Sequence, residues 1–332
     1  MTAARCKKKN WIDAPDGGRA NDGRRPQGDQ QDMSIHNFLV KTAIQMANLP
    51  GELLSPSSCL YVAGDLHPNG FALDFYNHNL GDDLNIPLVA HLSGKKVIPF
   101  RYSLVGKGRD RHLVIGSILE AWSCGNAIVW GAGLMNPLSK PLPHPKAIYA
   151  VRGRLTRNEL MKQGIACPEV YGDPAILLPY LYNPESPDSP GDGRVALVPH
   201  VSETGHPFVQ QWRSQGGIVL DLKNYGDWKG FVRMLKSCRS ILSSSLHGLI
   251  LADAYGIPSR RIILGEHLGH FKFQDYYSAF REKTPPPLSP EEVRHCPEAE
   301  LHRKISECWQ EIPGEIRRDL LKSCPFLRAE LR

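Results

Sequence analysis

The sequence predicts an α/β protein of two Rossmann-like domains that face each other across a cleft, followed by a C-terminal helical tail. The first observation is that short apolar runs alternate with segments of helical periodicity, which is typical of βαβ units and parallel sheets. The second is a proline- and glycine-rich segment, residues 183–193, that divides these runs into two sets. The third is the length of 332 residues with 41% hydrophobic and 22% charged residues, enough for two domains with sizeable cores.

The apolar runs are short enough for strands, and the segments between them have the length of helices. We expect strands at 71–76, 96–100, 112–115, 127–130 and 147–151 in the first half, and at 194–199, 217–220, 240–243 and 259–264 in the second. Helices are expected at 82–92, 155–163, 227–237 and 246–255. In open α/β sheets a ligand binds at the carboxyl ends of the strands, so the residues that follow each strand are the candidates for function.

Breaks in composition divide the chain into five expected parts. Residues 1–33 are rich in Gly, Asp, Gln, Lys and Arg with almost no apolar pattern, which predicts a disordered extension. A second proline cluster, at 283–290, separates the end of the chain from the rest. The expected parts are a disordered extension 1–33, an N-terminal Rossmann-like domain 34–183, a linker 184–193, a C-terminal Rossmann-like domain 194–283 and a helical tail 284–332.

Charge and cysteine usage exclude several classes of protein. The net charge of +6 (40 Lys+Arg against 34 Asp+Glu) is spread without a long basic run, which argues against nucleic-acid binding and suits a small anionic substrate. The eight cysteines contain no C-x-x-C pair, so we expect no metal site and no disulfide framework. No apolar run reaches the roughly 18 residues of a membrane span, and no signal peptide is recognised, so a cytoplasmic location is expected.

In the first half, one motif opens a predicted helix and three others follow predicted strands. At Asn79-Leu-Gly81-Asp82-Asp83, Gly81 permits a tight turn and the free N–H groups of a helix start attract anions, while Asp82 is equally a helix cap or a substrate contact. The other three are Trp130-Gly131-Ala-Gly133, Val151-Arg152 and Gly172-Asp173-Pro174-Ala175.

Each of these three has a structural and a functional interpretation. Gly131 and Gly133 begin like a dinucleotide fingerprint, but Asn136 stands at the third glycine position, which favours a turn that lets a ligand or backbone approach. The guanidinium of Arg152 either binds a phosphate or carboxylate, or lies on the surface and pairs with an acidic residue or with solvent. Asp173 is either part of a plain turn or a carboxylate aimed into the cleft.

The most informative segment is Ser243-Ser244-Ser245-Leu246-His247-Gly248, where a strand runs into hydroxyl residues at a helix start. Ser244 or Ser245 can cap the helix, which leaves N–H groups for an anion. His247, in the first turn, could donate a proton or contact a phosphate. A lone histidine is more often structural, but this context favours function.

Taken together, these features resemble the polysaccharide pyruvyl transferase family. The resemblance covers roughly residues 71–280, and the stretch Lys272-Phe273-Gln-Asp275-Tyr276-Tyr277 also fits. Each motif is weak alone, but five in order are fairly specific. One departure matters, because many members carry Arg immediately before the Leu-His pair, where this chain has Ser245. If that arginine binds the phosphate group of the family's donor substrate, Arg152 or Lys272 must bind this group in the present chain.

The resemblance implies a fold like that of GT-B glycosyltransferases, with phosphoenolpyruvate as donor substrate, no other cofactor, and a saccharide acceptor. The implied product is a cyclic pyruvate ketal that bridges two sugar hydroxyls, formed in exopolysaccharide or capsule biosynthesis. The implied catalytic residues are His247, Asp82 and Asp83, with His200 as an alternative acid. The implied substrate-binding residues are Asn79, Gly81, Gly131, Gly133, Arg152, Asp173, His200, Ser244, Ser245, Leu246, Gly248 and Lys272.

Two other functions remain open on the sequence. One is a GT-B glycosyltransferase with a nucleotide-sugar donor, in which Glu266 could contact the ribose. The other is a non-catalytic sugar-binding subunit, which the departure at Ser245 makes conceivable. If the acceptor is a lipid-linked oligosaccharide, the protein must work at the inner membrane face, and the basic extension and the helical tail are candidates for peripheral contact. Apolar positions such as Ile305 and Leu320 instead favour a tail that packs back on the domains.

Overall fold

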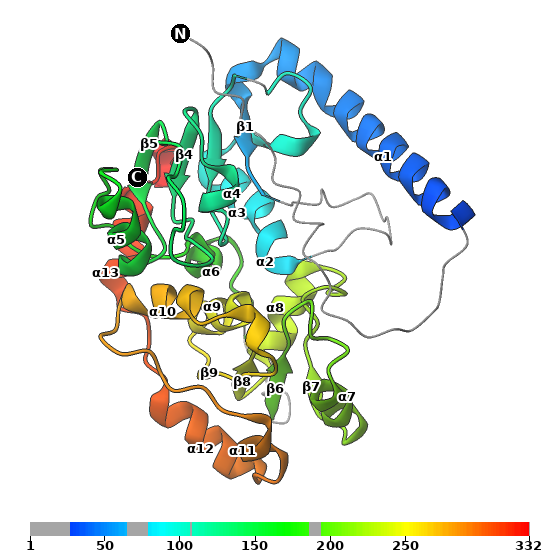
Figure 1. Cartoon of the computed structure of the whole chain (residues 1–332), viewed down its shortest axis with the longest axis vertical. Helices are drawn as coiled ribbons and strands as arrows, with labels where there is room; N and C mark the ends of the chain where they lie inside the picture. The colour runs from blue at the N-terminus through cyan, green and yellow to red at the C-terminus, as the bar shows by residue number, and fades with distance from the viewer. Residues whose placement is uncertain (1–26, 65–78, 107, 186–193, 332) are drawn as a thin grey trace.

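The computed structural model describes residues 27–64, 79–106, 108–185 and 194–331, with side chains from residue 41 onward. It is a mixed α/β structure with two parallel sheets, one of five strands and one of four (Figure 1). The predicted strand 71–76 lies outside the described residues. The other eight predicted strand segments each overlap an observed strand.

The first sheet has the strand order β2-β1-β3-β4-β5, and all of its pairs are parallel. Its strands are β1 (Cys59–Val62), β2 (Lys96–Pro99), β3 (Arg111–Leu113), β4 (Ala127–Trp130) and β5 (Ala147–Ala150). This is a doubly wound order whose direction of winding reverses between β1 and β3. Strand β1 was not predicted, although the turn residues of the 3₁₀ helix η1 (Pro56–Ser58) directly before its apolar run could have indicated it.

The second sheet repeats this arrangement with the order β7-β6-β8-β9, again all parallel. Its strands are β6 (Val195–Val198), β7 (Ile218–Val219), β8 (Ser240–Ser243) and β9 (Ser259–Arg261). The winding reverses between β6 and β8. A ligand site is therefore expected outside the carboxyl ends of these two strands, as it is outside those of β1 and β3.

Helices connect the strands and complete the chain. They are α1 (Gln27–Leu54), α2 (Leu80–Asp83), α3 (Asn85–Ser93), α4 (Leu119–Trp122), α5 (Arg154–Lys162), α6 (Leu178–Leu181), α7 (Pro207–Ser214), α8 (Trp228–Lys236), α9 (Leu246–Ala254), α10 (Phe271–Ser278), α11 (Pro290–Arg294), α12 (Glu298–Cys308) and α13 (Gly314–Lys322). Four 3₁₀ helices also occur, η2 (Phe100–Tyr102), η3 (Pro174–Leu177), η5 (Glu266–Leu268) and η6 (Ala329–Leu331). Predicted helices 155–163, 227–237 and 246–255 agree with α5, α8 and α9 to within a residue or two at each end.

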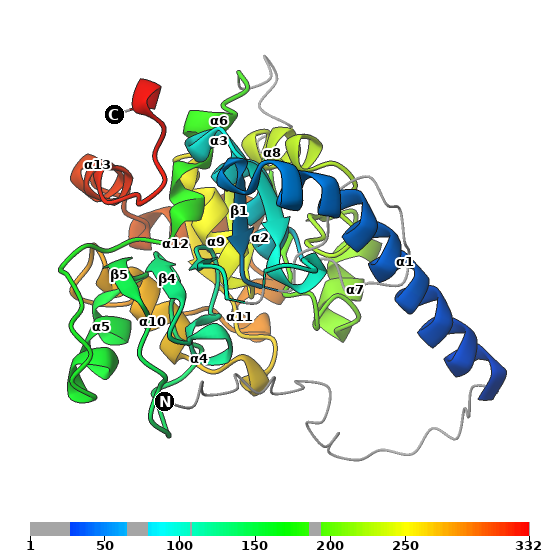
Figure 2. The same cartoon turned by 90° about the horizontal axis from the view of Figure 1, so that it is seen from above.

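Two expectations need correction. The predicted helix 82–92 is two helices, α2 and α3, because Pro87 has no N–H to donate to the carbonyl of Asp83. The predicted disordered extension 1–33 lies outside the described residues as far as residue 26, but residues 27–33 belong to α1, which extends away from the sheets (Figures 1 and 2). Of the predicted linker 184–193, residues 186–193 lie outside the described part.

Helix α9 joins the two sheets. It is apolar on all sides, and its residues except His247 are buried, because it packs on β8 and β9 on one side and on η3 of the first unit on the other. One buried cluster accordingly contains Val62 of the first sheet and Val198 of the second. The two units therefore share part of their core, which fixes the position of one sheet's carboxyl ends against the other's.

The C-terminal segment packs back on both units. Helix α12 contacts β8 and β9, and α13 contacts η3. Ile305 and Leu320 are fully buried, and the indole N–H of Trp130 donates to the carbonyl of Leu320 at 3.0 Å. These apolar positions of the tail are thus occupied by intramolecular packing. No helix in the described part of the chain is long and apolar enough to cross a membrane.

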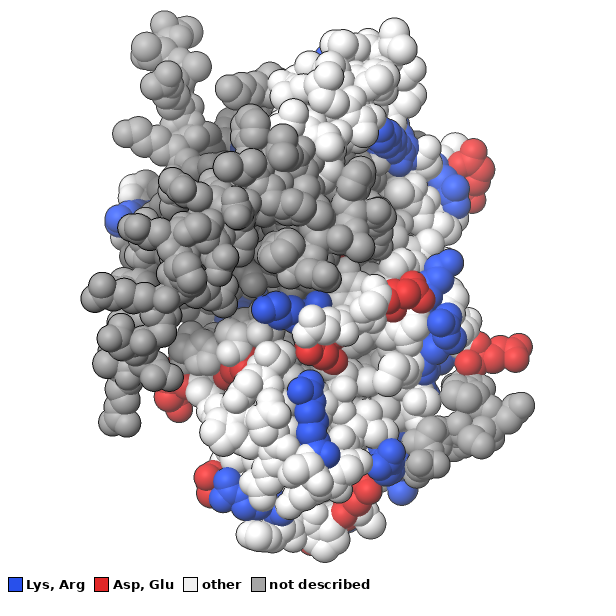
Figure 3. Space-filling model, turned by 90° about the vertical axis from the view of Figure 1, so that its right-hand side faces the viewer, with Lys and Arg blue, Asp and Glu red and all other residues white. Residues whose placement is uncertain are grey.

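Charged side chains of both signs are interspersed over the described surface on one face of the molecule (Figure 3). A nucleic-acid-binding face carries clustered Lys and Arg, which the described part of this face does not show. This agrees with the even spread of charge along the sequence.

Candidate active site

The helix starts of α2 and α9 meet between the two sheets. The backbone N–H of Leu80 in α2 donates to the carbonyl of Leu222, in the loop after β7, at 2.9 Å. A Cβ atom added to Gly81 would lie only 1.9 Å from Nδ1 of His247. The first motif of the N-terminal unit and the Ser-Leu-His-Gly motif of the C-terminal unit, 166 residues apart as counted from Gly81 to His247, are therefore in contact.

Gly81 makes room for the imidazole of His247. The side chain of Asn79 caps α2 by accepting the N–H of Gly81 at 3.3 Å, and its Nδ2 donates to Asp82 Oδ2 at 2.9 Å. Asn79 thus fixes the turn that presents Gly81 to the histidine. The N-cap of α2 is therefore Asn79, and the expectation that Asp82 could be the cap is wrong, because Asp82 lies inside the helix.

We expect Gly81→Ala to lower turnover by displacing His247, because the new methyl group overlaps the imidazole and has no space beside it. For a residue that takes part in the chemistry, such a displacement is expected to lower turnover about tenfold or more. The measurement is turnover beside thermal unfolding. Gly314→Ala, at an open position in the first turn of α13, is the matched control and should leave turnover unchanged.

The two aspartates of the motif have different surroundings. Asp83 is buried and accepts the phenolic O–H of Tyr225 at 2.9 Å, which ties α2 to the second unit. Asp82 is only partly buried, and its carboxylate raises the pKa of Lys272 against the larger opposing effects of burial and neighbouring cations. Both carboxylates thus have protein partners, and Asp82 is the less buried of the two.

Arg152 lies deeper than the sequence suggested. It is fully buried; Nε donates to Asp275 Oδ2 at 3.0 Å, and Nη2 forms an ion pair with the same oxygen at 2.9 Å. Nη1 donates to Ser117 Oγ at 2.6 Å, and the two oxygens of Asp275 also accept from Thr156. The guanidinium is thereby held by protein partners, and it contributes positive charge to the site.

Gly131 and Gly133 provide space for neighbouring groups. A Cβ on Gly133 would lie 2.4 Å from the guanidinium carbon of Arg152, and one on Gly131 would lie 2.2 Å from Pro174 Cδ. Both glycines therefore lie against protein groups. This agrees with the interpretation of the motif as a turn that allows a close approach, rather than as a dinucleotide fingerprint. Asp173 is buried and caps η3 by accepting the N–H of Ala175 at 3.0 Å, and burial raises its pKa to about 6.

The start of α9 leaves its first N–H groups without a side-chain cap. Ser245 is the N-cap residue but makes no side-chain capping bond, whereas Ser244 Oγ accepts the backbone N–H of His200 at 3.0 Å. Leu246 is buried, and Gly248 allows the helix to approach Val198 of β6. The uncapped helix start, at the carboxyl end of β8, is suited to an anion.

Lys272 of α10 is a buried lysine whose charge acts on His247. It is only 4% exposed, its Nζ lies 5.4 Å from the ring centroid of Phe273, and none of the hydrogen bonds or ion pairs found among the described residues involves its ammonium. Burial, followed by the positive charges of Arg152 and Arg261, lowers its pKa to about 8. A bound anion would stabilise the charge of Lys272, so the position suits an anionic group of a ligand.

His200 and His247, near the start of α9, are neutral at neutral pH. Burial, then the charge of Lys272, lowers the pKa of His247 to about 3, and the same two causes lower the pKa of His200 to about 3. His247 keeps partial contact with solvent. A bound anion would oppose the effect of Lys272 and raise both pKa values.

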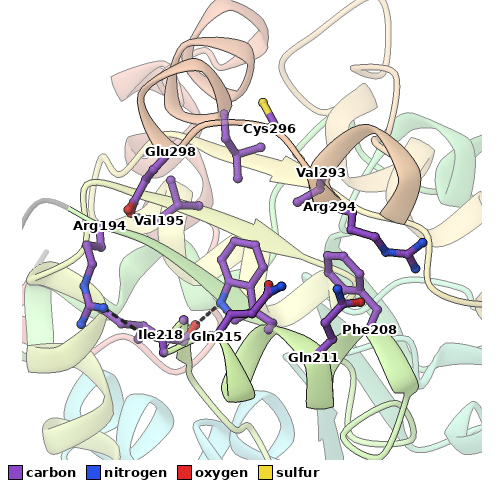
Figure 4. Close-up of a pocket in the computed structure, with 14 residues that line it drawn as sticks. Arg194, Val195, Phe208, Gln211, Gln215, Ile218, Val293, Arg294, Cys296 and Glu298 are labelled. Carbon is purple, nitrogen blue, oxygen red and sulfur yellow. Dashed lines mark hydrogen bonds between the residues drawn. The ribbon is translucent and has the colours of Figure 1, made fainter.

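A separate pocket of about 200 Å³ lies at the opposite end of the second sheet (Figure 4). It is lined by Arg194 and Val195 at the start of β6, by Ile218 at the start of β7 and by α7, α11 and α12. Because ligands of parallel sheets bind at carboxyl ends, the region around His247 is a stronger candidate for the active site than this pocket.

The structure brings most of the predicted residues to one place and adds two buried charged residues that sequence reasoning missed, Arg261 and Glu203. Asp275 is also buried here, and on the sequence it was named only as part of the stretch that begins at Lys272. It follows Lys272 by one helical turn in α10. Within the described residues, no group of three His, Cys, Asp or Glu side chains could hold a metal ion.

Comparison with known proteins agrees with this arrangement. A family model described as "Polysaccharide pyruvyl transferase" matches residues 15–263. The chain is also similar to "Uncharacterized protein L143" of Acanthamoeba polyphaga mimivirus, with 29% identity over 211 residues that cover 61% of this chain and 71% of that protein. No solved structure matches the chain. The family match includes His247 and Arg152 but ends before Lys272.

Proposed function

Because the chain belongs to the polysaccharide pyruvyl transferase family, we propose that it transfers the pyruvyl group of phosphoenolpyruvate to two hydroxyls of a sugar residue. The product is a cyclic pyruvate ketal, formed in exopolysaccharide or capsule biosynthesis. The observation that carries the proposal is the buried Lys272, whose charge acts on the neutral His247 at the uncapped start of α9. In this proposal the two units act as a GT-B-like enzyme, with the site between them.

The donor has two anionic groups, and the site offers two kinds of partner. In the proposal, Lys272 holds the phosphate in place of the arginine that Ser245 replaces. The N–H groups at the start of α9 bind the carboxylate. Arg152, held by Asp275, adds positive charge without leaving its protein partners. No other cofactor is required.

The chemistry needs a proton at the methylene carbon of the donor and removal of protons from the acceptor. The donor phosphate raises the pKa of His247, so that this residue can protonate the methylene carbon. A sugar hydroxyl then attacks the resulting oxocarbenium-like carbon, the C–O bond to phosphate breaks, and the second hydroxyl closes the ketal. Asp82 orients the attacking hydroxyls. A lipid-linked acceptor would place the enzyme at the inner membrane face.

A turnover assay tests the proposal. The protein is incubated with phosphoenolpyruvate and a series of free and lipid-linked saccharides, and inorganic phosphate and the acceptor's mass are measured. Phosphate release together with a pyruvyl ketal on the acceptor supports the proposal. Consumption of a nucleotide sugar instead would favour the glycosyltransferase alternative. Its expected ribose contact, Glu266, has a side chain that is 87% exposed, with Oε2 3.9 Å from Nε2 of His270. Saccharide binding with neither donor consumed would favour the non-catalytic subunit.

A further inference from the structure

The loops after β6 and before α10 form a chain of polar side chains that the proposed function does not use. Nδ1 of His200 lies 2.7 Å from Oγ of Ser202, and this oxygen lies 3.0 Å from Nε2 of His267. Nε2 of His267 is in turn 3.8 Å from Oε1 of Glu203. Four side chains, from His200 in the cleft to His267 in η5, are therefore connected.

The backbone determines the direction of these hydrogen bonds. The N–H of Ser202 donates to Nδ1 of His200 at 3.3 Å, so Nδ1 is an acceptor and the ring proton is on Nε2. Ser202 Oγ can then donate its proton to Nδ1 while it accepts the Nε2 proton of His267. The donors point from His267 toward His200, which leaves the Nε2 proton of His200 for another acceptor.

The two ends of the chain have different environments. The side chain of His267 is 53% exposed and can exchange protons with water. His200 donates its backbone N–H to Ser244 Oγ at 3.0 Å, and apart from burial the charge of Lys272 has the largest effect on the pKa of both His200 and His247. His200 and His247 are thus in one neighbourhood, next to the start of α9.

Glu203 is a buried anion beneath this chain. Its side chain is 3% exposed, and neither carboxylate oxygen has a hydrogen-bond partner in the described structure. The charged groups around it are His267 of η5, Arg261 of β9 and Lys272 of α10. Oε1 of Glu203 lies 3.8 Å from Nε2 of His267, so this buried side chain is placed to orient that ring.

We propose that His200, Ser202 and His267 form a proton relay from solvent to the departing phosphate, with Glu203 as a positioning residue for His267. The proposal rests on the proposed function. As the C–O bond of the donor breaks, Nε2 of His200 gives its proton to the phosphate oxygen. Nδ1 takes the proton of Ser202 Oγ, which takes the Nε2 proton of a protonated His267. Solvent then reprotonates His267, and one acceptor hydroxyl proton leaves to solvent.

The remaining proton of the reaction is accounted for separately. The other acceptor hydroxyl supplies the proton that His247 delivers to the methylene carbon. Two hydroxyl protons are therefore lost, one proton is gained by carbon and one by phosphate, so the sum over the reaction is unchanged. The relay assigns different histidines to the two proton transfers, which lets each ring hold the tautomer that its step needs.

Ser202 gives the sharpest test, because it is exposed and its removal leaves both histidines in place. Ser202→Ala should lower kcat at least about tenfold and change the pH dependence of kcat, while the stabilisation of the protein by phosphoenolpyruvate stays unchanged. Ser202→Thr, which keeps the hydroxyl, should restore most of the turnover. His267→Ala should show the same loss, with partial rescue by added imidazole.

The outcomes separate the relay from the proposed function. Equal kcat and equal pH profiles for wild type, Ser202→Ala and His267→Ala would overturn the relay and leave the pyruvyl transferase activity standing. A wild-type protein that neither binds nor consumes phosphoenolpyruvate would overturn both. Loss of turnover in Ser202→Thr equal to that in Ser202→Ala would also contradict the relay, because the hydroxyl would then not be the group that matters.

Discussion

Replacing Lys272 by Met should abolish the binding of phosphoenolpyruvate at millimolar concentration and at the same time make the empty protein more stable. Lys272 is 4% exposed and burial is the largest cause that lowers its pKa, so removing its charge relieves a desolvation penalty. The same charge is the proposed phosphate contact. Opposite signs for affinity and stability distinguish a ligand-binding lysine from a structural one, whose loss would lower both.

The free energy of unfolding should depend on pH in a way that shows the same cost of burying the charge of Lys272. The pKa of Lys272 is lowered to about 8 from 10.5, so the folded protein binds this proton less readily than the unfolded chain. The cost of burying the charged Lys272 therefore lowers the free energy of unfolding fully below pH 8. This cost is relieved as the pH rises from 8 to 10.5. Its size is on the order of 2–3 kcal/mol, and it should be absent in Lys272→Met.

Thermal unfolding and calorimetric titration check this prediction. Lys322→Met, an exposed lysine in the last turn of α13, is the matched control and should change neither affinity nor stability by much. A Lys272→Met protein that is less stable than wild type, or that binds phosphoenolpyruvate with unchanged affinity, would contradict the assignment of this residue as the phosphate partner.

His247→Ala should lower kcat by about 10²–10⁴-fold and leave the fold intact. The ring is the proposed acid of the site and is in contact with Gly81, where the two units meet. His144→Ala, which removes an exposed histidine, should have no effect. Near-normal turnover of His247→Ala, measured with the same donor and acceptor, would remove His247 from the chemistry.

His247→Ala should also be less sensitive to acid. Burial lowers the pKa of His247 from 6.5 to about 3, so the unfolded chain binds this proton more readily than the folded protein. The wild type therefore loses stability as the pH falls from 6.5 toward 3, and the variant should lose less over that window. Urea unfolding at pH 7 and pH 4.5 measures the difference.

The repeated elements of the fold were accessible from the sequence because each strand and helix shows its own periodicity. Helix α9 was predicted at nearly its observed bounds, since an apolar run begins directly after Ser245. The position of α9 between the two sheets was not predictable, because a helix that is apolar on all sides indicates burial without naming its neighbours. Pro87 indicated that the helix would be divided into α2 and α3, but the prediction of a single helix over 82–92 did not take this proline into account.

The candidate site was predicted unevenly for a related reason. Local motifs identify residues at helix starts, and Gly81 and His247 are both of this kind. Which residues meet across 100 or more positions depends on tertiary packing, so the contact of Gly81 with His247 and the pairing of Arg152 with Asp275 were not foreseen. Glu203 lies in a loop with no motif around it, and only its burial draws attention to it.

Calorimetric titration of the wild-type protein with phosphoenolpyruvate, in parallel with uridine and guanosine diphosphates, tests the central claim most directly, because it requires no knowledge of the acceptor. We expect phosphoenolpyruvate to bind with proton uptake, seen by comparing buffers of different ionisation enthalpy, since the donor's negative charge raises the pKa of His247 from about 3. At about 100 times the dissociation constant it should also add roughly 2.7 kcal/mol of stability. Binding of a nucleoside diphosphate, with none of phosphoenolpyruvate, would contradict the account.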